Sequence, residues 1–306
     1  MEVLVVGATG FVGGAIARSL GAGGHHVAGL VRSADTESTH RLAVDGIRPV
    51  VGDLEHHLEA IVAGAMEAEA VVFAPQVRPG VEQKSVAACL EAMAGTGKTF
   101  LFVSGSGVFL QRTQGAWSED SFAEDDAFIP EPLAIPRIET EWAVRAAAAR
   151  GVRGIVVRPP LIWGPGDHGH VSMVYRSVAL TGSACYVGDG LSAYSHVHID
   201  DACELFALTL EKGVTGGLYH AVGGEIPNRW IAEAVARDLH CATRSLTMNE
   251  AVAVWGEFGA LIMASSSRSR APRSRQELGW VARRTDMLST VGEPHLRALA
   301  VPSTPA

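Results

Sequence analysis

A chain of 306 residues, 47% hydrophobic and 19% charged, is long enough for one large globular domain or for a domain with a smaller partner. The formal net charge of −8 argues against a nucleic acid or an anionic membrane surface as partner. No apolar stretch approaches bilayer length, and the N-terminus lacks the basic segment of a signal peptide. We therefore expect a cytoplasmic protein whose cysteines, Cys89, Cys185, Cys203 and Cys241, are reduced and mostly packed in the core.

The first half of the chain alternates short apolar runs with helical patterns. Strands are predicted at residues 3–6, 27–31, 48–51, 70–73, 99–104 and 154–158, where β-branched and apolar residues leave no polar face. Helices are predicted at residues 11–21, 55–66, 82–94 and 137–150. This order predicts an α/β fold over residues 1–160, a doubly wound parallel sheet of the Rossmann type to which later segments return.

The second half has longer loops rich in glycine, histidine and aromatic residues, with helices predicted near residues 171–180, 200–211 and 229–239. We expect residues 161–306 to form mainly a smaller substrate-capping region over the carboxyl ends of the strands, where such sheets bind ligands. Residues 265–275 are rich in serine and arginine and are predicted to form an exposed, solvated loop.

Residues 7–13 form a G-x-x-G-x-x-G turn directly between the first predicted strand and the first predicted helix. Gly7 permits a tight turn, Gly10 lets backbone amides approach a pyrophosphate, and Gly13 lets the helix pack closely on the sheet. The helix N-terminus adds partial positive charge. A purely structural turn is the alternative, and the strand–turn–helix context favours dinucleotide binding.

The second predicted strand ends at Arg32 and Ser33, with no acidic residue to grip the ribose hydroxyls of NAD. These side chains suit a 2′-phosphate, so NADP(H) is favoured over NAD(H), with an ordinary solvated arginine as the alternative. Asp53, after the third strand, either approaches the adenine or belongs to a plain Gly-Asp turn. The predicted cofactor contacts are Gly7, Thr9, Gly10, Phe11, Val12, Gly13, Arg32, Ser33, Asp53, Leu54, Ala74, Ser104, Arg137, Pro160 and Leu161.

Several motifs together resemble the extended and atypical short-chain dehydrogenase/reductases over nearly the whole chain. They are the glycine turn, Gly-Asp-Leu at 52–54, Arg-Pro-Pro at 158–160, Trp-Gly-Pro-Gly at 163–166, Val-His-Ile-Asp-Asp at 197–201 and Leu-Gly-Trp at 278–280. The resemblance implies an NAD(P)-binding Rossmann fold with epimerase-, dehydratase- or reductase-like activity. It is specific to the superfamily and does not indicate one substrate.

The catalytic Ser or Thr, Tyr and Lys that the resemblance implies are missing. Aligning Glu141 with the glutamate that follows the family's lysine puts Arg137 in the lysine position, Leu133 in the tyrosine position and Gly105 in the serine position. Leucine cannot donate a proton, and arginine, with a pKa above about 12, cannot serve as a base but can still neutralise an anion or hydrogen-bond a ribose. Ser106, beside the vacant serine position, either replaces the missing hydroxyl or only ends the strand.

The loop after the sixth strand supplies candidates for proton transfer, because the unperturbed pKa of histidine suits acid–base work near neutral pH. Surface histidines without a role are the alternative. The predicted catalytic residues are His168, His170, Tyr194, Ser106 and Arg137. The predicted substrate contacts are Gln76, Phe109, Trp163, Asp167, Tyr175 and His196, with core packing as the alternative for Tyr175. The sequence around His168 shows no further ligand cluster, so no metal is predicted.

Three functions fit these features. The first is an NADP(H)-dependent atypical short-chain reductase that acts on a carbonyl or conjugated alkene of a small, mostly hydrophobic metabolite. The second is a non-redox cyclase, isomerase or dehydratase that uses His and Tyr groups, with the cofactor structural or absent, and loss of all three catalytic residues favours it. The third is an NADP-sensing regulator without turnover. We expect the reductase, acting as a monomer or homodimer on a small molecule.

Overall fold

Seven parallel strands form the central sheet, in the order β10-β6-β5-β4-β1-β2-β3. The structure is a computed structural model that describes residues 1–34, 36–166 and 169–302. The strands are β1 (Glu2–Val6), β2 (His26–Val31), β3 (Arg48–Val51), β4 (Ala70–Phe73), β5 (Thr99–Val103), β6 (Arg153–Arg158) and β10 (Leu218–His220). The predicted doubly wound α/β sheet is confirmed, because the strand order reverses direction between β1 and β4.

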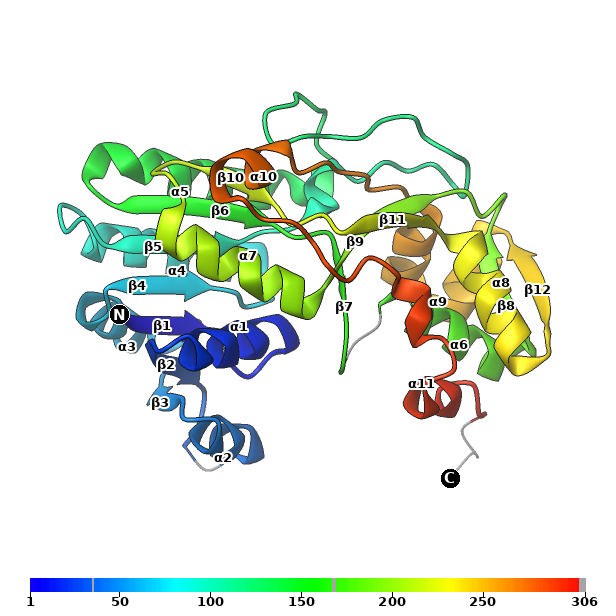
Figure 1. The fold of residues 1–306 in the computed structure, drawn as a ribbon, viewed down its shortest axis with the longest axis horizontal. Coiled ribbons are helices and arrows are strands. Elements are labelled where there is room, and N and C mark those ends of the chain that lie inside the picture. Colours follow the sequence, from blue (N-terminus) through cyan, green and yellow to red (C-terminus); the bar gives the residue numbers. More distant parts are fainter. Residues whose placement is uncertain (35, 167–168, 303–306) are drawn as a thin grey trace.

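Helices cover both faces of this sheet, as Figure 1 shows. The central strands β4 and β5 are therefore buried along their whole length. One face packs against α1 (Phe11–Ala22), α2 (Glu37–Val44) and α7 (Ile199–Lys212). The other face packs against α3 (Leu58–Glu67), α4 (Pro79–Ala92) and α5 (Ile135–Ala146). Short 3₁₀ turns are η1 (Ser106–Phe109), η2 (Pro132–Ala134), η3 (Ala147–Arg150) and η4 (Met287–Thr290).

The second half of the chain builds a smaller region beside the carboxyl ends of the strands (Figure 1). Its sheets are the three strands β7 (Leu161–Trp163), β9 (Ala193–His198) and β11 (Gly224–Pro227), and the pair β8 (Ser183–Val187) and β12 (Ala242–Leu246). Its helices are α6 (His170–Thr181), α8 (Asn228–Leu239), α9 (Met248–Ala264) and α11 (Pro294–Ala298). In the described part of the chain, no helix is both long and apolar enough to cross a membrane.

The serine- and arginine-rich segment is not the exposed loop that its composition predicts. Ser265, Ser266 and Ser267 are each 1% exposed, and the segment bridges the backbone of Gln111 and Tyr194 before α10 (Pro272–Leu278) begins. The hydroxyls of Ser266 and Ser267 find hydrogen-bond partners in this setting, which makes the burial of these two residues tolerable. The segment therefore joins the two halves of the molecule, and its prediction as a solvated connection is wrong.

The four cysteines are free thiols, and three of them are buried. Burial raises the pKa of Cys89 and of Cys203 to about 12. A thiol that stays protonated is a poor nucleophile, so these two residues serve the core.

Candidate functional site

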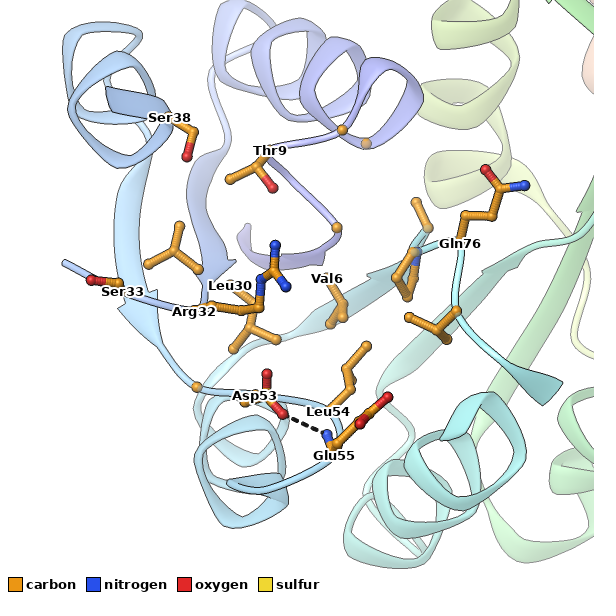
Figure 2. A pocket seen from close by; sticks show the side chains of 18 of the residues that line it. Val6, Thr9, Leu30, Arg32, Ser33, Ser38, Asp53, Leu54, Glu55 and Gln76 are labelled. Carbon is orange, nitrogen blue, oxygen red and sulfur yellow. Dashed lines mark hydrogen bonds between the residues drawn. The ribbon is translucent and has the colours of Figure 1, made fainter. Parts of the chain in front are cut away.

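A cleft of about 900 Å³ opens at the carboxyl ends of β1, β2 and β4, where the strand order reverses. Figure 2 shows the side chains that line it. The lining residues come from the glycine turn, the end of β2, the turn after β3 and the segment after β4. Of the predicted residues, Gly7, Thr9, Gly10, Phe11, Val12, Gly13, Arg32, Ser33, Asp53, Leu54, Ala74 and Gln76 line this cleft.

The glycine turn can pack this closely because Gly7 and Gly13 have no side chain. Gly7 has φ +91°, and a Cβ there would lie 2.9 Å from the carbonyl carbon of Ala74. A Cβ on Gly13 would overlap the carbonyl oxygen of Gly7. No side chain of the described residues caps the N-terminus of α1 at Gly10, so its first amides are available to an anion. The turn therefore fits a dinucleotide pyrophosphate.

Arg32 and Asp53 both line the cleft, and in Figure 2 the Arg32 guanidinium points toward Thr9 while Asp53 lies on the other side of the Arg32 side chain. The Asp53 carboxylate accepts the backbone N–H groups of Glu55 at 2.8 Å and His56 at 2.9 Å. These bonds, with a smaller contribution from the nearby arginine, lower the pKa of Asp53. Asp53 therefore caps its own turn as an anion, while the exposed Arg32 presents a cation beside the Ser33 and Ser38 positions of the cleft.

A buried ionic cluster holds the ends of β5 and β6 to α5. The Glu141 carboxylate is 1% exposed and accepts Arg158 Nε at 2.9 Å, Arg158 Nη2 at 2.5 Å and Ser104 Oγ at 2.5 Å. The Arg158 guanidinium also lies over the rings of Phe109 and Phe128, 5.9 Å and 5.4 Å from their centroids. The Ser104 hydroxyl and the Phe109 ring are thus engaged inside the protein, which argues against the cofactor and substrate contacts expected of them.

Ser106 lies at the start of η1 and is 5% exposed. Ser267 Oγ lies 2.9 Å from Ser106 Oγ and 2.8 Å from the Ser106 carbonyl oxygen. The single Ser267 proton goes to the carbonyl, which can only accept, and the Ser106 hydroxyl can then donate to Ser267 Oγ. Ser106 is thus paired with another neutral hydroxyl, whereas Ser104 donates to the Glu141 carboxylate.

Arg137 extends from α5 to the end of β5 and pairs with a glutamate that the sequence analysis did not single out. Arg137 Nη2 donates to Glu82 Oε2 at 2.6 Å, and Nη1 to the Val103 carbonyl at 3.3 Å. The Glu82 side chain is 2% exposed, and its burial raises the pKa of Glu82 while Arg137 opposes the shift. Leu133, one turn earlier, is 67% exposed and contributes no polar group.

His170 and Tyr194 lie in the smaller region, where His170 begins α6 and Tyr194 lies in β9. Burial lowers the pKa of His170 to about 4 and raises that of Tyr194. Both groups are thus neutral near pH 7. Neutral His170 can accept a proton or hydrogen bond, whereas Tyr194 can donate one. Asp167 and His168, predicted in the same loop, lie outside the described residues.

The other predicted substrate residues have internal partners. Tyr175 is fully buried in α6, where its hydroxyl donates to Asp238 Oδ2 at 2.6 Å and accepts the Gly292 N–H at 2.9 Å. Trp163 Nε1 donates to His196 Nδ1 at 3.2 Å, and both residues are buried. Tyr175 is thus a core residue, which agrees with the core packing predicted for it as the alternative to a substrate contact. Pro160 is buried, Leu161 is half-buried, and neither lines the cleft.

Comparison with known proteins places this site in a family. The sequence profile of the NAD dependent epimerase/dehydratase family matches residues 3–222. The chain belongs to this family. An uncharacterized protein of Schizosaccharomyces pombe is 31% identical over 92% of this chain and 94% of its own length. The 3-diazoavenalumate denitrifying reductase of a Streptomyces species is 26% identical over 92% of this chain and 95% of its own.

Solved structures of the epimerase/dehydratase family share the fold. The dTDP-glucose 4,6-dehydratase DesIV from Streptomyces venezuelae, solved with NAD and TYD bound, has a TM-score of 0.75 at 21% identity. The match covers 95% of this chain and 96% of that one. The resemblance to extended short-chain dehydrogenase/reductases is thereby confirmed, and this chain is an enzyme of that type that lacks the usual Ser, Tyr and Lys.

Sequence reasoning missed the partners of the site. Glu82 and Asn228 carry no motif, and Ser267 lay in the segment predicted to be solvated. Each forms a hydrogen bond to a predicted residue more than 50 positions away.

Across residues 1–34, 36–166 and 169–302, no group of three His, Cys, Asp or Glu side chains is arranged to hold a metal ion.

Proposed function

We propose that this protein is an NADP(H)-dependent reductase that acts on a carbonyl or conjugated alkene of a small, mostly hydrophobic metabolite. The observation that carries the proposal is the dinucleotide cleft with the Arg32 cation at its edge, while its two carboxylates are engaged, Asp53 by backbone amides and Glu55 by Arg78. The name of the Streptomyces relative supports reductive chemistry. NADPH bound in this cleft would supply a hydride to carbon, and the protein would have to supply a proton to the neighbouring atom.

Ser106 is the group that we propose for this proton, because it lies beside the vacant serine position and its hydrogen-bond partner, Ser267, is another neutral hydroxyl. A serine hydroxyl is a weak acid. After Ser106 has donated its proton, solvent must protonate its oxygen again before the next turnover. Tyr194 is the second candidate donor. His170 is neutral, and the Asn228 amide nitrogen donates to Met263 O, so the Asn228 oxygen accepts from His170 Nδ1. The proposed part of His170 Nε2 is therefore that of an acceptor. Arg137 is held by Glu82, and we propose that its remaining N–H groups bind the nicotinamide ribose.

A non-redox cyclase, isomerase or dehydratase is the second candidate. The observation that favours it is that the two positions where the family has its tyrosine and lysine hold the exposed Leu133 in η2 and the paired Arg137 in α5, and neither is a conventional proton donor. We also propose that the enzyme works in the cytoplasm, as a monomer or homodimer, without nucleic acid.

A turnover assay distinguishes the two candidates. Purified protein is incubated with NADPH and a panel of ketones, aldehydes and enones, while absorbance at the reduced-nicotinamide band and product formation are followed together. We expect one mole of NADPH to be consumed for each mole of product. Conversion of a substrate without loss of NADPH would overturn the reductase and support the non-redox enzyme.

We expect Arg32→Ala to lower the affinity for NADPH by roughly 10- to 100-fold and to leave the affinity for NADH unchanged. The physical reason is loss of a charge-assisted contact with the 2′-phosphate, which contributes about 1.5–3 kcal/mol. Fluorescence titration with each cofactor measures both affinities. Arg41→Ala is the matched control, because Arg41 is an exposed arginine on α2 that pairs with Glu37 and does not line the cleft. Equal losses for both cofactors would contradict the assignment of NADP(H).

A further inference from the structure

The alternation of serine and arginine at residues 267–270 follows from how this segment lies in the fold. Ser267 and Ser269 are 1% and 4% exposed, whereas Arg270 is exposed. Neighbouring side chains of an extended segment point to opposite faces. The serines therefore face the core, and the arginines face away from it.

The long loop after η1 lies along this segment, and we call residues 111–126 of that loop the strap (the loop at the top of Figure 1). The N–H of Phe122 donates to Arg268 O at 3.1 Å, and the N–H of Arg270 donates to Phe122 O at 2.9 Å. The N–H of Gly115 donates to Ala264 O in α9 at 2.9 Å. The strap thus crosses from the central sheet to the smaller region and back.

The outward-facing arginines pair with an acidic stretch of the strap. Residues 119–126 contain five carboxylates. Arg270 Nη2 donates to Asp126 Oδ2 at 2.7 Å, and Arg273 Nη2 donates to Asp125 Oδ2. The arginine-rich segment therefore has its counter-charges in a part of the chain more than 140 positions away.

Arg268 links the strap to the smaller region. Its Nη1 donates to Ser118 O at 2.6 Å, and its guanidinium lies 4.2 Å from the centroid of the Trp117 ring. Its Nε and Nη2 donate to the two carboxylate oxygens of Glu225 in β11, at 3.0 Å and 2.8 Å. One guanidinium thus holds the outer part of the strap to β11.

Apart from these contacts the strap has little buried surface. It contains no helix or strand, and of its residues, all of which the structure describes, only Gly115 and Glu124 are buried. The Glu124 carboxylate accepts the N–H of Ser274 at 3.2 Å, so this anchor is ionic as well. Segments with few buried apolar contacts open locally at a lower free energy than the whole protein. Exposed ion pairs are individually weak and are screened by salt.

We propose that the strap opens as a unit while the central sheet stays folded, and that a latch of three arginines holds it closed, Arg268, Arg270 and Arg273. The latch is charged on both sides, so ionic strength sets the fraction of molecules in which the strap is open.

Opening of the strap has a consequence for the proposed proton donor. The strap begins at Gln111, whose N–H donates to Ser266 O at 2.8 Å, and the next residue, Ser267, pairs with Ser106. Ser106 is 5% exposed, so a local movement is needed before solvent can return a proton to it. Only this consequence rests on the proposed function.

Hydrogen exchange followed by mass spectrometry tests the opening without cofactor or substrate. Exchange of the strap is compared with that of β5 at about 20 mM and about 500 mM NaCl. We expect the strap to exchange faster than β5 at both salt concentrations, and high salt to speed its exchange by about 3- to 10-fold without changing that of β5. A strap that exchanges as slowly as β5, or at a rate independent of salt, would overturn the proposal. A failed reductase assay leaves this test valid.

Arg270→Ala tests the latch itself. We expect exchange of the strap at low salt to become about 2- to 5-fold faster and its response to salt to shrink, because one ion pair is lost. Arg150→Ala is the matched control, since Arg150 is also an exposed arginine in an ion pair, with Glu91, and lies far from the strap in sequence. Unchanged exchange in Arg270→Ala, or an equal change in both variants, would show that the arginines do not hold the strap.

Discussion

Gly13→Ala is expected to reduce the affinity for NADPH by at least roughly 100-fold, a loss of about 2.7 kcal/mol of binding free energy. The added Cβ would lie 2.8 Å from the carbonyl carbon of Gly7 and would overlap its oxygen. The first turn of α1 must then move away from β1, which displaces the backbone amides that face the pyrophosphate. Fluorescence titration with NADPH measures the loss.

Gly21→Ala is the matched control for this substitution. Gly21 belongs to the same helix, and no described atom lies within 4 Å of the position its Cβ would take. Alanine is a better helix former than glycine by about 1 kcal/mol, so the variant should bind NADPH normally and be slightly more stable. If Gly13→Ala folds and retains wild-type affinity, the cofactor does not bind at this turn.

Glu141→Ala is expected to lower the free energy of unfolding by about 3–5 kcal/mol, because it leaves the Arg158 guanidinium buried without a counter-charge. Arg158 is 5% exposed, and Glu141 accepts its hydrogen bonds at the junction of α5 with β5 and β6. Urea unfolding monitored by circular dichroism measures the change.

Glu139→Ala provides the control in the same helix. Glu139 is exposed, and its hydrogen bond is with Gln83 at the surface. Its substitution should change the free energy of unfolding by no more than about 0.5 kcal/mol. Equal effects of the two substitutions would show that the Glu141 ion pair is not a major contributor to stability.

The strands of the sheet could be predicted because each is marked by a short run of consecutive residues. Consecutive apolar residues between helical patterns identify buried parallel strands, and β4 is buried throughout and has the predicted bounds. The serine-rich segment was not predictable in this way, since burial of Ser266 and Ser267 depends on the distant residues Gln111 and Ser106. Composition describes a segment alone, whereas burial depends on what the rest of the chain places against it.

In the candidate site, too, local motifs could be predicted from the sequence and contacts between distant residues could not. The glycine turn is a local motif, and its residues line the cleft as a group. His170 was read as part of a loop, but the helix α6 begins at this residue and buries it. The pairing of Arg137 with Glu82 joins residues 55 positions apart, and Ser106 with Ser267 joins residues 161 apart. Such contacts depend on how the halves of the fold pack together, and they cannot be predicted from the spacing of residues in the sequence.

Transfer of an isotopic label from the cofactor tests the proposed reductase most directly. The protein is incubated with NADPH deuterated at C4, in separate reactions for the two faces of the nicotinamide, together with the panel of ketones, aldehydes and enones. We predict that one of the two labelled cofactors places deuterium on carbon in a product detected by mass spectrometry, and that the other does not. Product that forms without deuterium from either cofactor would contradict hydride transfer and leave the non-redox enzyme as the function of this fold.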